Sequence, residues 1–190
     1  MSKQSSLTRY RLGRPWCEAI ELPDRRRFIL RPMTPADAPK LREGFRNLTP
    51  EEIRMRFMHP ISELTPRYAL QLATLDPEHE FALVLVEAKP PEEAAIHAVT
   101  RARIDESGEA AEFAIIVGGD LKRHGLGRLM LGRTVEWCRK KGLAAIYGFI
   151  LRDNRPMLAL TRSLGFRLLE TETADVIEAR LEFPQSPARH

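Results

Sequence analysis

Hydrophobic and polar residues follow two periods along this chain, and together these predict a mixed α/β fold. Short apolar or alternating runs predict strands at residues 28–31, 81–86, 96–104, 110–117, 145–151, 166–170 and 175–182. Apolar residues three or four positions apart predict helices at residues 34–48, 49–57, 65–75, 127–141 and 156–164. Thr34 and Thr49 each precede a proline, an order typical of a capped helix start. We therefore expect helices packed against a mixed sheet.

The length and composition predict one folded domain. The chain has 190 residues and 43% hydrophobic content, which is enough for a single core. We expect a basic, partly disordered lead-in at residues 1–24, a single domain at 25–183 and a flexible tail at 184–190. The lead-in is assigned on its charge, because Lys3, Arg9, Arg11 and Arg14 occur there without an acid before residue 16.

Charge and cysteine content restrict the classes of function. A formal charge of +4 is too small an excess for a dedicated nucleic-acid binder. Two cysteines give no disulfide framework, and Cys138 lies on an apolar helical stripe, so a cytoplasmic protein is expected. Neither a signal peptide nor an apolar run of membrane-spanning length is evident. The five histidines are scattered without a metal-ligand spacing, so no metal site is expected.

The segment from Asp120 to Arg128 places a glycine-spaced turn between an apolar strand and a long helix. Gly125 and Gly127 let the backbone approach a ligand closely, and the free N–H groups of the first helical turn suit a phosphate. Two common nucleotide motifs do not fit. A Walker loop needs Lys followed by Ser or Thr after its last glycine, and a dinucleotide fold needs a third glycine, whereas position 130 is Met.

The spacing of Lys122, Gly125 and Gly127 resembles the coenzyme A turn of the GNAT acetyltransferases, whose first position is usually Gln or Arg. Within this superfamily, the chain most resembles the GNAT domain of bacterial Pat-type protein-lysine acetyltransferases. Four passages carry this resemblance, and together they span about residues 28–182: Phe28–Pro32, Leu48–Phe57, Ala111–Ala114 with Asp120–Lys122, and Asp153–Met157. The resemblance implies a six- to seven-stranded, mostly antiparallel sheet with a splayed central strand pair and helices on both faces.

The same resemblance implies an acetyl-CoA-dependent N-acetyltransferase that uses no metal. The implied acceptor is a protein lysine, with an acyl-CoA synthetase as a candidate partner, and a homodimer is compatible with the family. Two alternatives stay open: acetylation of a small amine such as a polyamine or an amino-sugar, and a non-catalytic module that binds CoA.

Glu112 is the candidate base, because a protonated lysine cannot attack a thioester until its proton is removed. In the family that this chain resembles, the Glu of Ala-Glu-Phe-Ala has this role. We expect partial burial to raise the pKa of Glu112. From the residues alone, an outward strand carboxylate paired with an Arg is the competing interpretation, and Glu109 is a weaker candidate base.

The resemblance also assigns the coenzyme contacts. Backbone groups of Ile115, Ile116 and Val117 would hold the pantetheine arm. Amides of Arg123, His124, Gly125, Leu126, Gly127 and Arg128 would hold the pyrophosphate. The side chains of Arg123 and Arg128 either add charge there or stay solvated, and His124 is expected to be an exposed turn residue. Asn154 either contacts the coenzyme or caps a helix.

Three further residues leave alternatives open. Thr161 stands where many family members carry a Tyr that protonates the leaving thiolate, so thiolate release would depend on water or on the acidity of CoA itself. Arg54 and Arg56 border the implied acceptor cleft, where they would suit an acidic partner or remain solvated helix charges.

Overall fold

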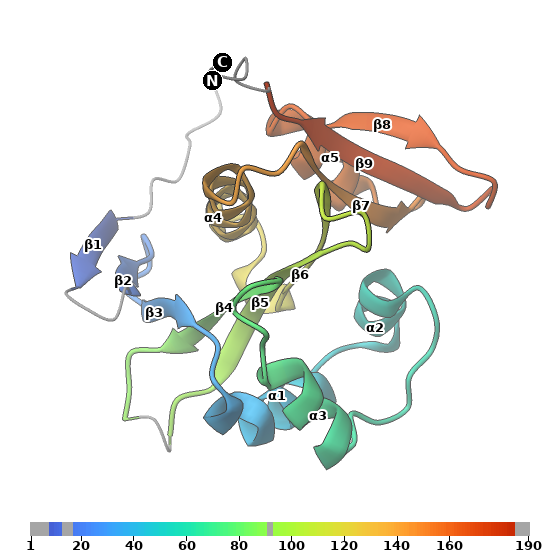
Figure 1. Ribbon diagram of the computed structural model, residues 1–190. Helices are drawn as coiled ribbons and strands as arrows, with labels where there is room; N and C mark the ends of the chain where they lie inside the picture. The colour runs from blue at the N-terminus through green and yellow to red at the C-terminus, as the bar shows by residue number, and fades with distance from the viewer. Residues whose placement is uncertain (1–7, 13–16, 91–92, 185–190) are drawn as a thin grey trace.

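The computed structural model describes residues 8–12, 17–90 and 93–184. In these ranges the chain forms one nine-stranded sheet with the order β1-β2-β3-β4-β5-β6-β7-β9-β8 (Figure 1). The strands are β1 (Thr8–Leu12), β2 (Cys17–Glu21), β3 (Arg27–Pro32), β4 (Glu80–Glu87), β5 (Ile96–Ile104), β6 (Ala110–Val117), β7 (Ala145–Leu151), β8 (Arg167–Glu170) and β9 (Val176–Glu182). The helices are α1 (Ala38–Arg46), α2 (Pro50–Phe57), α3 (Pro66–Ala73), α4 (Leu126–Lys140) and α5 (Arg155–Ser163), with 3₁₀ turns η1 (Pro35–Asp37) and η2 (Gly119–Leu121). These bounds confirm the mixed α/β class and each helix and strand expected from residue 28 onward.

One strand pair in the sheet is parallel, and it separates early. β6 pairs with β7 only where Ala110–Glu112 faces Ala145–Tyr147, whereas β6 pairs with β5 along its whole length. All the other neighbouring strands that the structure describes are antiparallel. The sheet therefore splays open after Glu112, as expected, and leaves the second half of β6 unpaired on the side of β7.

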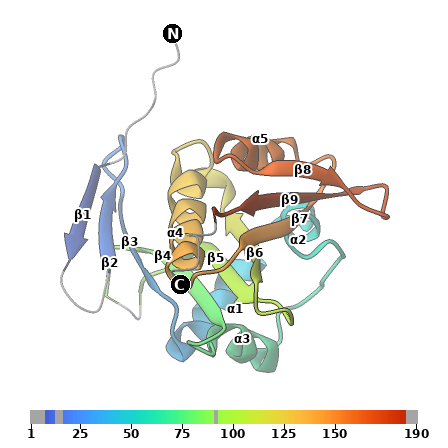
Figure 2. The same ribbon diagram turned by 45° about the horizontal axis from the view of Figure 1, so that its top comes forward.

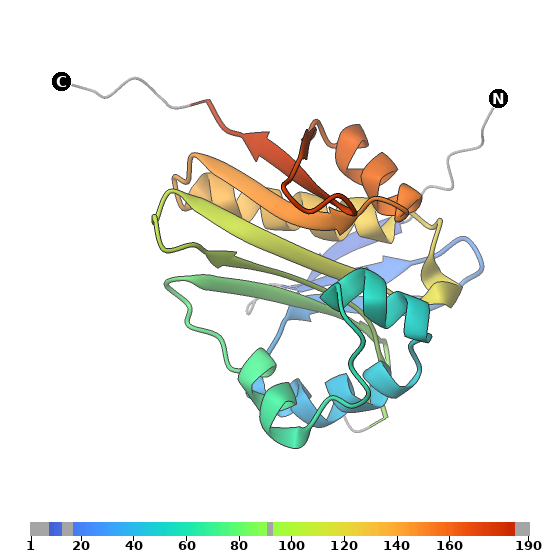
Figure 3. The ribbon, with the colours of Figure 1, turned by 90° about the vertical axis from the view of Figure 1, so that its right-hand side faces the viewer.

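Helices cover both faces of the sheet (Figure 3). On one face, α1 and α3 pack on β4, and the partly buried side chains of Ile53 and Phe57 bring α2 to the same cluster. On the other face, α4 crosses the middle of the sheet and buries apolar residues against β3, β4, β5, β6 and β7. α5 joins this second face beside β7 and β9. The splayed strands thus lie between two helical layers.

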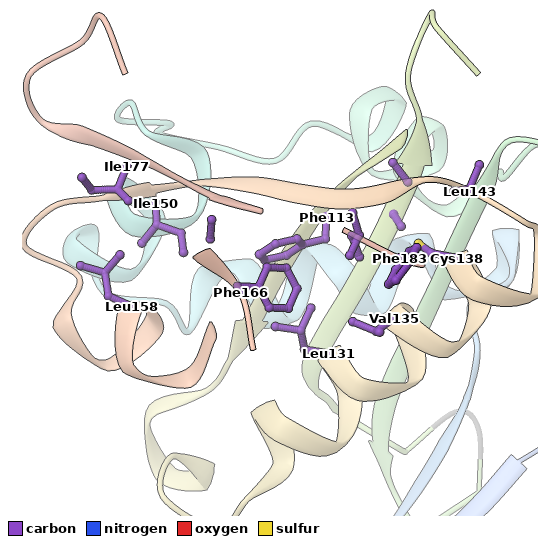
Figure 4. Close-up of a cluster of buried hydrophobic side chains, with 14 residues drawn as sticks. Phe113, Leu131, Val135, Cys138, Leu143, Ile150, Leu158, Phe166, Ile177 and Phe183 are labelled. Atoms are coloured by element: carbon purple, nitrogen blue, oxygen red, sulfur yellow. The ribbon is translucent and has the colours of Figure 1, made fainter. Parts of the chain in front are cut away.

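An aromatic ring fills the angle where β6 and β7 separate. A Cβ added at Gly148 of β7 would lie 2.6 Å from the ring of Phe113, so only glycine leaves room for this ring. The Phe113 ring also meets Phe166 edge to face, with ring centroids 5.4 Å apart (Figure 4). Phe113 is buried in the cluster beneath α4 and α5. This packing sets the point at which the two strands diverge.

Two segments of residues 1–24, the expected lead-in, form strands in the structure. Residues 8–12 and 17–21 form β1 and β2, which extend the sheet at the edge opposite β8 and raise its strand number above the expected six or seven (Figure 2). Ile20 and Leu22 are buried. Glu18 is buried on the same face and accepts a hydrogen bond from Arg133 of α4, so a charged residue interrupts the apolar pattern of this strand. The rest of the lead-in and residues 185–190 of the tail lie outside the described residues.

Among the described residues, no helix combines the length and apolarity needed to span a bilayer.

Candidate active site

Glu112 lies at the last position where β6 pairs with β7, and the splay begins after it. Its register partners are Arg103 on β5 and Tyr147 on β7. Its side chain is exposed, which contradicts the expected partial burial. Strand alternation turns Phe113 into the core beneath α4, so Glu112 faces the opposite layer, which contains α2. The carboxylate is therefore accessible beside the cleft between the strands.

The turn at Lys122–Leu126 has the backbone shape of an anion site. Arg123 and Gly125 both adopt left-handed conformations, with φ of 72° and 79°. Gly125 is the N-cap of α4, and its position requires no side-chain cap. Alternating left-handed residues ahead of a helix point successive N–H groups into one concavity, and the helix dipole adds positive potential there. The left-handed Arg123 is unusual for a residue with a Cβ, and its conformation supports this shape.

The residues expected to hold the pyrophosphate differ in burial and in the contacts that they make. Leu126, the first residue of α4, is fully buried, so only its backbone faces the turn. Gly127 approaches α5 closely, since an added Cβ would lie 3.1 Å from Leu160. Arg128 donates to the Ser163 carbonyl and hydroxyl at 2.9 and 2.8 Å, so its side chain joins α4 to the end of α5. The exposed Arg123 has no such contact in the described part of the chain.

His124 is half-buried, which differs from the exposed turn residue expected from the sequence. Its Nδ1 atom is buried without a hydrogen-bond partner among the described residues. His124 lies near enough to Asp24, in the loop before β3, to help lower the pKa of that carboxyl. His124 thus lies at the junction between the turn and the N-terminal strands.

The second half of β6 leads from Glu112 to this turn. Ile115, Ile116 and Val117 are all half-buried and pair with β5 alone. About 17 Å of extended strand separates Glu112 from Val117. A ligand that runs along the open edge of β6 can therefore reach both the turn and Glu112 only in an extended form.

Asn154 and Thr161 both use their polar atoms within α5. The Asn154 side-chain oxygen accepts from the Met157 amide at 3.3 Å, which makes Asn154 the helix cap. Thr161 is fully buried, and its hydroxyl donates to the carbonyls of Met157 and Leu158, both at 3.1 Å. The Thr161 hydroxyl is therefore directed into the helix backbone and is a poor candidate for a proton donor at the cleft.

Two ion pairs connect α2 to the loops beside the gap between β6 and β7. The Lys122 ammonium contacts the Glu52 carboxylate at 2.6 Å, which joins α2 to the glycine turn. Arg54 contacts Asp153 at 2.6 Å, which joins α2 to the loop before α5. The hydrogen bonds that Arg54 donates to Glu51 and to Asp153 raise the pKa of Arg54. Lys122 therefore binds α2, and its side chain is not turned into the concavity of the turn.

Tyr147 lies beside Glu112 and was not predicted from the sequence as a site residue. Its position directly beside Glu112 follows from the parallel register of β6 and β7, and no local spacing indicates this pairing. Burial, with the carboxylates of Asp105 and Glu112, raises the pKa of Tyr147, so the phenol keeps its proton at neutral pH. Arg180 of β9 lies over its ring at 5.7 Å.

These residues could hold acetyl-CoA as an acyl donor. Amides of the turn would contact its pyrophosphate, and backbone groups on the open edge of β6, which leads back to Glu112, would contact its pantetheine arm. The close approach of Gly127 to Leu160 leaves little room for a Cβ at this position. No cluster of metal-ligating side chains occurs within residues 8–12, 17–90 and 93–184.

Comparison with known proteins supports this interpretation. The model of the acetyltransferase (GNAT) domain family matches residues 27–167. The [ribosomal protein bS18]-alanine N-acetyltransferase of Escherichia coli K12 is 36% identical over 72 residues, which cover 38% of this chain and 47% of that enzyme. The chain thus spans about half the length of the curated relatives that it matches.

Solved structures share the fold at low sequence identity. The GNAT domain of S. lividans PAT superposes with a TM-score of 0.79 and 18% identity, and the match covers 90% of this chain and 99% of that one. Spermidine N-acetyltransferase from Vibrio cholerae, in complex with CoA and spermine, gives a TM-score of 0.64 and 17% identity, with 82% and 95% covered.

Proposed function

The chain belongs to the GNAT acetyltransferase family, and on this premise we propose that it transfers the acetyl group of acetyl-CoA to the side-chain amine of a protein lysine. The observation that carries the proposal is the position of Glu112. This carboxylate lies where β6 stops pairing with β7. The open edge of β6 beyond it leads to the left-handed turn at Arg123–Gly125. A donor anchored at the turn would therefore present its thioester beside Glu112.

The proposed reaction is direct attack of the amine on the thioester carbonyl. Glu112, alone or through a water, takes the proton of the lysine ammonium, so that the nitrogen lone pair can form the new C–N bond. The C–S bond breaks, and the thiolate of CoA leaves and takes up a proton. Because Thr161 donates within α5, this proton comes from water or from the phenol of Tyr147 beside Glu112.

The backbone of the chain would bind the donor. Amides from Arg123 through Arg128 would contact the pyrophosphate, and Ile115, Ile116 and Val117 would extend β6 onto the pantetheine arm. The Asn154 side-chain oxygen caps α5, which leaves its amide nitrogen as the group available to a ligand. Acetyl-CoA supplies the activated acyl group, and the chain supplies orientation and the base.

The charge around Glu112 disfavours a polycationic acceptor. Arg103 is its partner on β5, and the guanidinium of Arg56 lies near enough to interact with the Glu112 carboxylate. A polyamine such as the ligand named for the V. cholerae neighbour would meet these positive charges. A protein acceptor, for which the family resemblance suggests an acyl-CoA synthetase, avoids this repulsion when its lysine lies in an acidic surrounding.

The proposal is tested by acetyl transfer to a whole proteome. The protein is incubated with labelled acetyl-CoA and a bacterial lysate, and the modified proteins are identified by mass spectrometry. We expect a small set of lysine-acetylated proteins with the native chain and at least a tenfold weaker signal with Glu112→Gln. Labelling confined to small amines would contradict the proposed acceptor, and equal labelling by both proteins would contradict the role of Glu112.

A further inference from the structure

A hollow of about 90 Å³ lies between the helical layer of α1–α3 and the sheet, next to the proposed base. Its walls are mostly apolar, and two arginines also line it, Arg56 from α2 and Arg101 from β5. The apolar wall includes Phe45, Phe57, Leu64, Leu72, Val99 and Ile116. This volume can hold several waters or one small acidic side chain. A hollow of this kind favours a group that is small and negatively charged.

The hollow lies on the same face of the sheet as Glu112. Arg101 is opposite Ala114 in the β5–β6 register, one alternate position from Glu112, and Val99 is opposite Ile116. Residues two apart on a strand share a face, so Glu112, Ala114 and Ile116 form one row toward α2. An acceptor whose amine reaches Glu112 therefore has its neighbouring groups beside Arg56 and Arg101.

Arg56 has an unusual environment for a surface cation. It is half-buried, lies over the ring of Phe57 at 4.8 Å, and forms no ion pair with a carboxylate within the described ranges. Burial, together with the positive charge of Arg101, lowers the pKa of Arg56 to about 10, which still leaves it charged at neutral pH. Arg54, two residues earlier, is instead neutralised by Glu51 and Asp153. The charge of Arg56 is thus available to a ligand.

The surrounding acids do not balance the cations. Arg101 contacts Glu80 at 3.4 Å, and Arg103 approaches the same carboxylate at 4.0 Å. Three guanidinium groups, those of Arg56, Arg101 and Arg103, therefore share two carboxylates, Glu80 and Glu112. One more negative charge would neutralise the site.

We propose that the acceptor carries a carboxylate within reach of its reactive amine, and that Arg56, with Arg101 behind it, binds this carboxylate in the hollow under α2. This inference rests on the proposed acetyl transfer and names the class of acceptor. The carboxylate belongs either to an acidic residue adjacent to the acetylated lysine or to a small amino acid. In both cases the ion pair orients the amine toward Glu112 and excludes acceptors that carry only positive charge.

The test compares acceptors that differ only in charge. Three peptides each contain one lysine, flanked by Glu, by Gln or by Arg, and a separate pair consists of Nα-acetyl-lysine and its amide. We expect kcat/KM to be about 10-fold to 100-fold higher for one carboxylate-bearing acceptor than for its neutral counterpart, as a charged hydrogen bond predicts. Preference in the peptide set assigns the carboxylate to a protein acceptor, and preference confined to Nα-acetyl-lysine assigns it to a small molecule.

Three variants test whether Arg56 causes the preference for a carboxylate-bearing acceptor. Arg56→Gln should abolish the preference, Arg56→Lys should keep part of it, and Arg67→Gln should leave it unchanged because the exposed Arg67 of α3 does not line the hollow. Equal kcat/KM for all acceptors, or a preference that survives in Arg56→Gln, would overturn the inference.

A binding measurement separates this inference from the proposed reaction. Fluorescence anisotropy of the same labelled peptides, with CoA present, reports acceptor affinity without turnover. Tighter binding of the Glu-flanked peptide to the native protein than to Arg56→Gln, in the absence of any acetylation, would support the inference and refute the proposed reaction. Equal affinity for the Glu-flanked and Gln-flanked peptides would count against the inference whatever the rate of acetylation.

Discussion

Glu112 lies among charged and phenolic side chains at the surface of the cleft. Arg103 and Tyr147 are its register partners on the two adjacent strands, and Arg56 approaches from α2. An exposed carboxylate can accept a proton from a substrate ammonium, directly or through water, and return it to solvent after each turnover. The proposed role of Glu112 as a base therefore depends on its position and not on burial.

The pH dependence of the reaction should reveal this role. In Glu112→Gln the acceptor lysine has to lose its proton to solvent, so the rate at pH 7 should fall by about 10²-fold to 10⁴-fold. The rate of the variant should then rise about tenfold per pH unit toward the ordinary lysine pKa of about 10.4. Initial rates between pH 6 and 10 measure this slope. Parallel profiles for the native and variant proteins would exclude Glu112 as the base.

The Asp37 carboxylate at the start of α1 links the stability of the protein to pH. The Asp37 carboxylate is buried, accepts two hydrogen bonds from Arg31 at 2.8 and 2.7 Å, and accepts a third from the Thr34 amide at 2.8 Å. Burial acts to raise the pKa of Asp37, but the bonds from Arg31 and Thr34 outweigh it and the net shift is downward. A lowered folded-state pKa gives stability that is present above about pH 4 and lost as the pH falls through the folded-state value.

Asp37→Asn should therefore lower the free energy of unfolding by about 1.5–3 kcal/mol at pH 7 and by less near pH 3. Urea unfolding at both pH values measures the difference. Glu43→Gln is a control, because Glu43 forms an exposed pair with Lys40 and should change stability by less than about 1 kcal/mol. An Asp37→Asn deficit of the same size at pH 3 and pH 7 would contradict the proposed linkage.

At the scale of elements, α2 connects the donor turn to the acceptor side of the cleft. It has no fully buried residue, so its position depends on the partly buried Ile53 and Phe57 and on its ion pairs. Glu52 both closes the capping box with Thr49 and binds Lys122 of the turn. A shift of the turn on donor binding would therefore be transmitted to α2, which carries Arg56.

Gly148 of β7 leaves room for the Phe113 ring where β6 and β7 separate. Gly148→Ala would drive a methyl group into the ring of Phe113, so we expect a loss of about 1–3 kcal/mol in unfolding free energy and weaker CoA binding. Gly132→Ala is the matched control, since its added methyl meets no atom within 4 Å and alanine favours a helix interior. Thermal unfolding and CoA titration of both variants provide the comparison. Unchanged stability in Gly148→Ala would show that Phe113 does not fix the splay.

At the scale of the whole molecule, the sheet separates the proposed donor turn from the proposed acceptor hollow. The turn before α4 belongs to one layer, and the hollow with Arg56 belongs to the other. The gap between β6 and β7 joins the two sides at Glu112. This arrangement explains why residues far apart in sequence, such as Arg56, Glu112 and Tyr147, meet at one site.

The elements from residue 28 onward could be predicted because their signals are local. Apolar period, prolines after capping threonines and the glycine turn all act within a few residues, and the structure confirms the elements that they indicate. β2 escaped prediction because Glu18 occupies a buried strand position that only its contact with Arg133, 115 residues away, explains. Similarly, the register that places Tyr147 beside Glu112 and the burial of Arg56 depend on tertiary packing. Local sequence does not encode either one.

The measurement that most directly tests the account is a calorimetric titration of the protein with CoA and, in parallel, with pantetheine, which lacks the pyrophosphate. If the amides of the turn at Arg123–Arg128 hold the pyrophosphate, CoA should bind at least tenfold more tightly than pantetheine. Gly125→Ala should remove most of this difference, because alanine disfavours the left-handed backbone at φ 79°. Equal affinity for the two ligands, or no binding of CoA, would contradict the central claim that this turn anchors the acyl donor beside Glu112.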